Sequence, residues 1–194
     1  MSGFSTARQK MVDGQVRASD VTDSRIIDAM LEVPRETFVP ENKRALAYLD
    51  LDLDVSEGAA AKRYLIKPAV LAKMLQAAEI KATDRVLVVG CATGYAAAVI
   101  ARFAGQVTAA ESAEGDPANA PFDVIVLNGA TEIIPEQLYG QLRNGGRLVG
   151  VFAMSRPPRA TIVTRSHGDF GDRALFDAAA PVLSGMERPP AFVF

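Results

Sequence analysis

The chain has 194 residues, of which 49% are hydrophobic and 23% are charged, a composition typical of a globular protein with a sizeable core. A formal net charge of −2 and the lack of an apolar run of about 18 residues argue against nucleic-acid and membrane partners. One cysteine excludes an intramolecular disulfide, one histidine argues against a metal site, and the N-terminus has no apolar stretch for export, so we expect a cytoplasmic protein.

The first 62 residues are expected to form a helical cap followed by a loop. Apolar residues at roughly helical spacing, interrupted by prolines, divide the cap into three helices. These helices are residues 4–16, 24–31 and 41–48. Residues 49–62 are acidic and then small, without a period, which is typical of a loop. The cap is either a packing element or one wall of a substrate cleft.

Residues 63–194 are expected to form an α/β core around a mostly parallel, doubly wound sheet. A helix is expected from Pro68 to Ala78, since proline suits the first helical position. Residues 85–89 (RVLVV) predict a strand buried on both faces. The small residues 90–94 (GCATG) then form a tight turn, and an alanine-rich helix is expected from Tyr95 to Phe103.

The GCATG turn connects a strand to a helix, so it sets free backbone N–H groups and the positive end of a helix dipole at the edge of the sheet. Nucleotide-like ligands bind in such places. The spacing differs from a dinucleotide fingerprint and is closer to the S-adenosylmethionine (SAM) loop of class I methyltransferases. The alternative is that Gly90 and Gly94 serve only close packing.

Residues 107–110 (VTAA) predict a second strand, and Glu111 at its end lies 21 positions after Gly90. An acidic residue at this distance, at the tip of the next strand, can accept hydrogen bonds from both hydroxyls of a ribose. The alternative is that Glu111 is a solvated loop carboxylate.

The connection after Glu111 is unusually short. Residues 112–121 are a polar loop, and residues 122–127 (FDVIVL) already predict the next buried strand. A doubly wound sheet normally continues through a helix and a third strand, which ten loop residues cannot hold. Either the protein lacks a helix–strand unit near 112–121, or the sequence as given omits an internal segment.

One more helix and three more strands are expected in the last third of the chain. The helix is residues 134–142, and the strands are residues 147–152, 160–165 and 173–179. Residues 144–146 (NGG) are expected to cap the helix, and the apolar residues 191–194 to pack down. Asn128 follows the strand at 122–127, so we expect it to face the cleft.

Four segments, in order, carry a resemblance to a known family. Residues 33–40 (VPRETFVP) are similar to its V-P-R-x-x-F-V-P segment, and residues 85–95 to its SAM loop, usually V-L-E-I-G-T-G-S-G-Y. Residues 122–130 and 142–149 are similar to its later Y-D-x-I and L-x-x-G-G-R-L-V segments. The chain is identified as a divergent member of the protein-L-isoaspartate O-methyltransferase family, over nearly its whole length.

The resemblance implies a Rossmann-like class I methyltransferase with a seven-stranded sheet and SAM as its cofactor. Such enzymes esterify the α-carboxyl of isoaspartyl residues in damaged proteins or peptides, which starts their repair. Positioning and desolvation of the carboxylate carry much of this work, because SAM is already a strong electrophile. The implied cofactor site is Gly90, Cys91, Ala92, Thr93, Gly94, Tyr95, Glu111 and Asn128.

The chain departs from the family in its substrate motif. Aligned on Pro68, it has Ile66 where the family has a serine that is held to be important for catalysis. Isoleucine cannot hydrogen-bond to a carboxylate. Lys67 and Asn128 are therefore the candidate catalytic residues, and the alternative for Lys67 is an exposed residue at a helix start.

The SAM loop departs as well. Val88 replaces an acidic residue, and Cys91 and Ala92 replace threonine and glycine. Ala92 adds a methyl group and penalises a positive φ, so the changes together predict weaker SAM binding. Cys91 is either a nucleophile, with its pKa lowered by a helix N-terminus, or a small packed thiol.

Three functions follow from these residues. The resemblance favours a SAM-dependent protein carboxyl O-methyltransferase of the isoaspartyl type. Ile66 and Val88 favour a catalytically inactive methyltransferase fold kept for binding or regulation. An NAD-dependent oxidoreductase fits Glu111 but not the glycine spacing.

Overall fold

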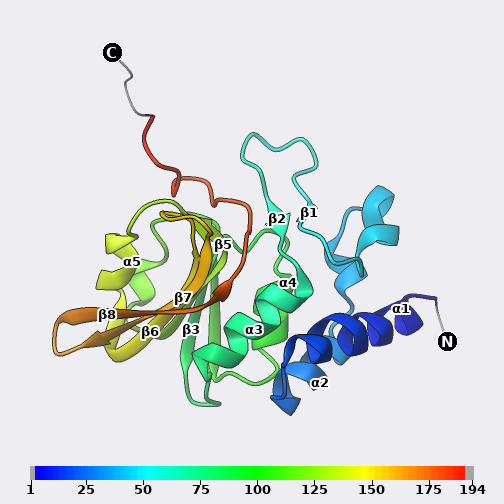
Figure 1. Ribbon diagram of the computed structural model, residues 1–194, viewed down its shortest axis with the longest axis horizontal. Helices are drawn as coiled ribbons and strands as arrows, with labels where there is room; N and C mark the ends of the chain where they lie inside the picture. Colours follow the sequence, from blue (N-terminus) through cyan, green and yellow to red (C-terminus); the bar gives the residue numbers. More distant parts are fainter. Residues whose placement is uncertain (1–2, 191–194) are drawn as a thin grey trace.

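The centre of the molecule is a six-stranded sheet with the order β4–β3–β5–β6–β7–β8 (Figure 1). The computed structural model describes residues 3–190. The strands are β3 (Arg85–Val89), β4 (Gln106–Ala110), β5 (Phe122–Thr131), β6 (Leu142–Phe152), β7 (Arg159–Ser166) and β8 (Asp169–Asp177). The first four run parallel, and β7 and β8 continue the sheet antiparallel. The expected mostly parallel α/β sheet is confirmed.

The number of strands differs from the family expectation. Within residues 3–190 the sheet has six strands rather than seven, and β4 forms one end of it. The short segment between β4 and β5 holds a 3₁₀ turn at Pro117–Asn119 and no strand. Since β4 and β5 both run parallel to β3 and flank it, residues 111–121 make the crossover from β4 to β5 without a helix–strand unit.

Helices cover both faces of the sheet (Figure 1). The long helices are α1 (Gly3–Met11), α2 (Ser24–Glu32) and α3 (Pro68–Ala78), and the short ones are α4 (Tyr95–Ile100) and α5 (Glu136–Gly140). The first four share one apolar cluster with one face of the sheet, and α5 packs on the other face. The predicted helices at 24–31 and 68–78 are confirmed.

Other predicted elements are shorter or different. The helix at 4–16 ends as α1 at Met11 and continues as a wider turn, and the helix at 41–48 is a 3₁₀ turn over Glu41–Leu46. The helix at 95–103 stops as α4 at Ile100. The segment 49–62 is a loop only in part, because β1 (Leu53–Asp54) pairs antiparallel with β2 (Tyr64–Leu65) beyond it.

The prediction that residues 144–146 cap a helix is wrong. These residues lie inside β6, where Leu142 pairs with Phe122 and the next pair is Arg147 with Val124. Gly145 has φ of +78°, so the glycines serve an irregularity in the strand instead of ending a helix. The tail 191–194 lies outside the described residues.

The buried strands alternate between two apolar clusters. In β3, Val86 and Val88 join the cluster under α3 and α4, and Leu87 and Val89 join the cluster under α5. Val88 is fully buried, so the residue at the family's acidic position is part of the core. Within residues 3–190, no helix has the length and hydrophobicity needed to cross a bilayer.

A buried ion pair fixes the amino ends of the parallel strands. The Asp84 carboxylate accepts a hydrogen bond from the Lys81 N–H (3.0 Å) and pairs with Arg147 Nη2 at 2.9 Å. The same guanidinium also donates to the carbonyls of Ala78 and Glu79, at the end of α3. The pair therefore joins α3, the start of β3 and β6.

Replacing Asp84 should destabilise the protein, because it leaves a largely buried guanidinium without its counter-ion. We expect Asp84→Ala to lower the free energy of unfolding by about 2–4 kcal/mol, measured by urea denaturation. The control is Asp177→Ala, which removes an exposed ion pair with Arg159 and should cost less than about 1 kcal/mol. Equal losses in the two variants would contradict this assignment.

Candidate active site

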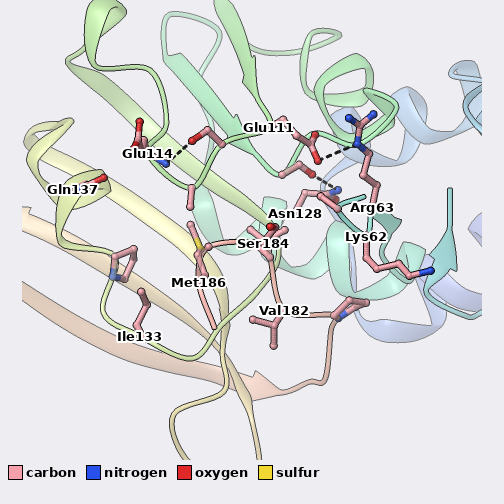
Figure 2. A pocket seen from close by; sticks show the side chains of 18 of the residues that line it. Lys62, Arg63, Glu111, Glu114, Asn128, Ile133, Gln137, Val182, Ser184 and Met186 are labelled. Carbon is pink, nitrogen blue, oxygen red and sulfur yellow. Dashed lines mark hydrogen bonds and ion pairs between the residues drawn. The ribbon is translucent and has the colours of Figure 1, made fainter. Parts of the chain in front are cut away.

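A cavity of about 790 Å³ lies where β3 and β4 end and β5 passes Asn128 (Figure 2). Parallel sheets place ligands at this edge, and the volume is in the range of small-molecule sites. The lining consists of residues 61–64, Gly90, residues 111–114, Asn128, residues 133–137 and residues 181–186. The sequence predicted three of these lining residues, which are Gly90, Glu111 and Asn128.

The turn after β3 is held in a left-handed conformation. Gly90, Ala92 and Gly94 have φ of +69°, +51° and +93°. Alanine in this region carries about 1–2 kcal/mol of strain. The Ala92 N–H donates to Glu111 Oε2 at 2.9 Å, and the N–H groups of Gly90 and Cys91 donate to the Ala110 carbonyl. Ala92 thus has the positive φ that an alanine disfavours.

Glu111 is bonded to several groups around the cavity. Besides the Ala92 N–H, its carboxylate accepts from Cys91 Sγ at 3.4 Å and forms an ion pair with Arg63 Nε at 3.6 Å. The Glu111 side chain remains 42% exposed, so it is open to a ligand in the cavity. Glu111 therefore lies at the tip of β4, beside the turn at the edge of the sheet.

The thiol of Cys91 is not an activated nucleophile. Burial, followed by the hydrogen bond to the Glu111 carboxylate and its charge, raises the pKa of Cys91 to about 11. The helix that follows spans only Tyr95–Ile100, and its N-cap is Gly94, three residues beyond Cys91. The raised pKa contradicts the lowered pKa that a nucleophilic Cys91 would need, and it favours the alternative of a packed, hydrogen-bonded thiol.

Asn128 connects the cavity floor to the β2 arm. Its side chain is 3% exposed, and Nδ2 donates to the Gly90 carbonyl at 2.9 Å and to the Tyr64 carbonyl at 3.2 Å. The amide therefore fixes the turn and the arm at a constant separation. The other loop residues face the cap, since Thr93 Oγ1 donates to the Phe38 carbonyl and the Tyr95 ring is buried against Phe38.

The C-terminal segment closes one side of the cavity, which the sequence did not indicate. It runs beside β5, where the Ala130 N–H donates to the Pro181 carbonyl (2.8 Å) and the Leu183 N–H to the Ala130 carbonyl (2.9 Å). A Cβ on Gly90 would lie 2.3 Å from Leu183 Cδ2, and one on Gly129 would lie 2.7 Å from the same atom. Gly90 therefore permits close packing of Leu183.

Lys67 does not line the cavity. It caps α3, and its backbone N–H donates to Asp52 Oδ1 at 2.9 Å. Within residues 3–190, no cluster of histidine, cysteine, aspartate and glutamate could hold a metal ion.

Comparison with known proteins gives the family. The family model named Protein-L-isoaspartate(D-aspartate) O-methyltransferase (PCMT) matches residues 6–114 and 105–157. A protein-L-isoaspartate O-methyltransferase 2 of Anaeromyxobacter sp. (strain Fw109-5) is 40% identical over 171 positions, covering 74% of this chain and 69% of that protein. The chain belongs to the PCMT family.

Other PCMT relatives agree. A protein-L-isoaspartate O-methyltransferase of Rhodopseudomonas palustris (strain ATCC BAA-98 / CGA009) is 38% identical and covers 91% of this chain and 93% of its own length. A solved protein-L-isoaspartate O-methyltransferase has a TM-score of 0.77 at 22% identity, covering 92% of this chain and 66% of that one. A Plasmodium falciparum protein solved with S-adenosyl-L-homocysteine has a TM-score of 0.73 at 16% identity. That match covers 91% of this chain and 98% of the Plasmodium chain.

The alignments with PCMT relatives are longer than the part of this chain that they cover. The Rhodopseudomonas alignment has 206 positions, more than the 194 residues of the chain. The two matches of the family model also overlap at residues 105–114, where β4 ends. The relatives therefore carry residues that have no counterpart in this sequence.

The position of the PCMT serine is inaccessible in this chain. Ile66 is 1% exposed and belongs to the apolar cluster under α3. Its carbonyl accepts from Arg35 Nη2 at 2.9 Å, and Arg35 Nε donates to the Ala47 carbonyl at 2.8 Å. The buried arginine of the V-P-R segment thus anchors the backbone that precedes Pro68.

A methyl group on Gly90 should disturb the cavity through Leu183. We expect Gly90→Ala to destabilise the protein by about 2–3 kcal/mol, from positive-φ strain and overpacking together. Adding Leu183→Ala should remove the overpacking part, so the two changes should cost less than their sum in urea denaturation. The control is Gly145→Ala, which has positive φ but open space. Strict additivity of Gly90→Ala and Leu183→Ala would refute the contact.

Cys91 should react slowly with alkylating reagents. At pH 8, a pKa of about 11 leaves roughly one thiol in a thousand ionised. We expect iodoacetamide to modify the native protein far more slowly than the urea-unfolded chain, as measured by mass spectrometry. Glu111→Gln should speed the native reaction, because it removes a charge that raises the pKa. A native rate equal to the unfolded rate contradicts the packed-thiol assignment.

Proposed function

We propose that the chain is a SAM-dependent protein carboxyl O-methyltransferase that esterifies isoaspartyl residues in proteins or peptides. Membership of the PCMT family supports the reaction. The observation that carries the proposal is the Glu111 carboxylate, which lies at the tip of β4 and lines the same cavity as Gly90 and Asn128. This arrangement suits a cofactor with a ribose at the sheet edge.

The cavity fits SAM in size and in the chemistry of its walls. Its volume of about 790 Å³ is within the range of small-molecule sites, and the Glu111 carboxylate is partly exposed within it. Leu183 fills the space directly above Gly90, so the cofactor would lie along Glu111 and Asn128 instead of against the first glycine. When bound, SAM supplies an electrophilic methyl group on a sulfonium.

The remaining chemistry requires little acid–base help from the protein. An α-carboxyl group has a pKa of about 3.3–3.7, so the nucleophilic carboxylate is already ionised at neutral pH. The reaction therefore needs no general base from the protein, and the buried isoleucine at position 66 does not deprive it of one. The chain has to hold the carboxylate in line with the methyl group and exclude water. Leu183, Met186 and Ile133 provide an apolar wall for this purpose.

The proposal also covers organisation and location. We propose that residues 1–194 form one methyltransferase-like domain, with a cap and loop over 1–62, a core over 63–194 and no helix–strand unit between β4 and β5. The overlapping family matches and the long alignments support the missing unit. We further propose a cytoplasmic location and no nucleic-acid partner, which agree with one cysteine and a net charge of −2.

The cofactor site is tested by calorimetry with SAM. We expect wild-type protein to bind SAM, and Glu111→Ala to bind it about 10- to 100-fold more weakly, because charge-assisted hydrogen bonds to the ribose are lost. Glu41→Ala, at an exposed position of the cap, is the control. Wild-type protein should also transfer a radiolabelled methyl group to an isoaspartyl peptide and not to its aspartyl counterpart. Absence of both binding and transfer in wild type ends the proposal.

A further inference from the structure

We propose that the Arg63 guanidinium recognises the α-carboxylate of the isoaspartyl substrate, since the chain has Ile66 where the resemblance implies a serine. This inference rests on the proposed function and names the substrate-binding group of that site. Ile66 is 1% exposed and cannot reach a ligand. A carboxylate brought beside an apolar wall needs a fixed positive charge or hydrogen-bond donor.

Among residues 3–190, two cationic side chains line the cavity, and they contact different carboxylates. Lys62 is 68% exposed, and its ammonium group pairs with Asp54 Oδ2 at 3.3 Å. Arg63 extends toward Glu111, across the part of the cavity that Asn128 also lines (Figure 2). Arg63 is therefore the positive charge that lies next to the proposed methyl donor.

The backbone of Arg63 is fixed at both of its polar groups. Its N–H donates to Ser56 Oγ at 2.9 Å, and its carbonyl accepts from the Val55 N–H at 2.9 Å. The next carbonyl, of Tyr64, accepts from Asn128. These hydrogen bonds fix the backbone that carries the guanidinium relative to the rest of the cavity. A fixed backbone suits a side chain that positions a substrate.

The donors of Arg63 are only partly used in the described residues. Its Nε atom is buried and has no hydrogen-bond partner, since Glu111 Oε1 lies at 3.6 Å, which is ion-pair and not hydrogen-bond distance. A guanidinium presents a planar fork that matches both oxygens of a carboxylate. The Arg63 side chain is 42% exposed although Nε is buried, so a carboxylate in the cavity would bind the exposed Nη end of the fork.

The ion pair between Arg63 and Glu111 couples binding of the substrate to binding of the cofactor. Glu111 is the carboxylate that we propose accepts from the cofactor ribose, and it now pairs with Arg63. Engagement of Glu111 by ribose hydroxyls weakens its hold on Arg63, which leaves the guanidinium to the substrate. We therefore expect the isoaspartyl peptide to bind more tightly when the cofactor site is filled.

The test compares two fluorescein-labelled peptides by fluorescence anisotropy in saturating S-adenosylhomocysteine. One carries isoaspartate, and the other is identical except that its α-carboxylate is a carboxamide. Wild-type protein should prefer the isoaspartyl peptide by about 10- to 100-fold, the range expected for charge-assisted hydrogen bonds. Arg63→Gln should bind both peptides equally, and Arg63→Lys should retain part of the preference because it keeps the charge without the fork.

Controls separate this inference from the proposed function. Arg17→Gln, which removes an exposed arginine paired with Asp13, should keep the wild-type preference. Arg63→Gln should still bind S-adenosylhomocysteine, which also shows that it is folded. A wild-type preference retained in Arg63→Gln, or a wild type without any preference, overturns the role of Arg63. Failure of wild type to bind SAM and to transfer a methyl group overturns the proposed function instead.

Discussion

The carboxylate of Glu111 is the group on which the geometry of the cavity depends. It accepts hydrogen bonds from the backbone N–H of the strained Ala92 and from the Cys91 thiol, and it forms an ion pair with Arg63. These contacts connect the β3 turn, the end of β4 and the β2 arm at one point. Because two parallel strands end beside each other, a residue that follows β4 can stabilise the turn that follows β3.

Much of the central sheet follows from local sequence. The β-branched run of β3 and the proline-initiated helix α3 are explained by periodicity and composition alone, and both have the expected bounds. The position of Glu111 was also predictable, since the spacing between a glycine turn and the next strand end fixes which residue meets the turn. The short connection after Glu111 left two explanations open, and within residues 3–190 β4 is an edge strand that pairs with β3 alone.

The rest of the site depends on contacts between distant segments. Arg63 precedes a two-residue strand and has no local motif. It is brought to the cavity by the hydrogen bond of its N–H to Ser56 and by that of Asn128 to the neighbouring Tyr64 carbonyl. The prediction for residues 144–146 (NGG) was wrong because the same glycine-rich sequence can end a helix or allow an irregularity in a strand. The buried position of Ile66 likewise results from packing under α3, which no pattern at that residue reveals.

Leu183 has a consequence for how the cavity comes into existence. Its contact with Gly90 joins two residues that are almost half the chain apart, and residues 181–186 become part of the wall through hydrogen bonds to Ala130 and Glu132. When the last strand of the sheet has been synthesised, the residues that form this wall have not yet been synthesised. The finished binding site thus exists only after residues 181–186 have left the ribosome.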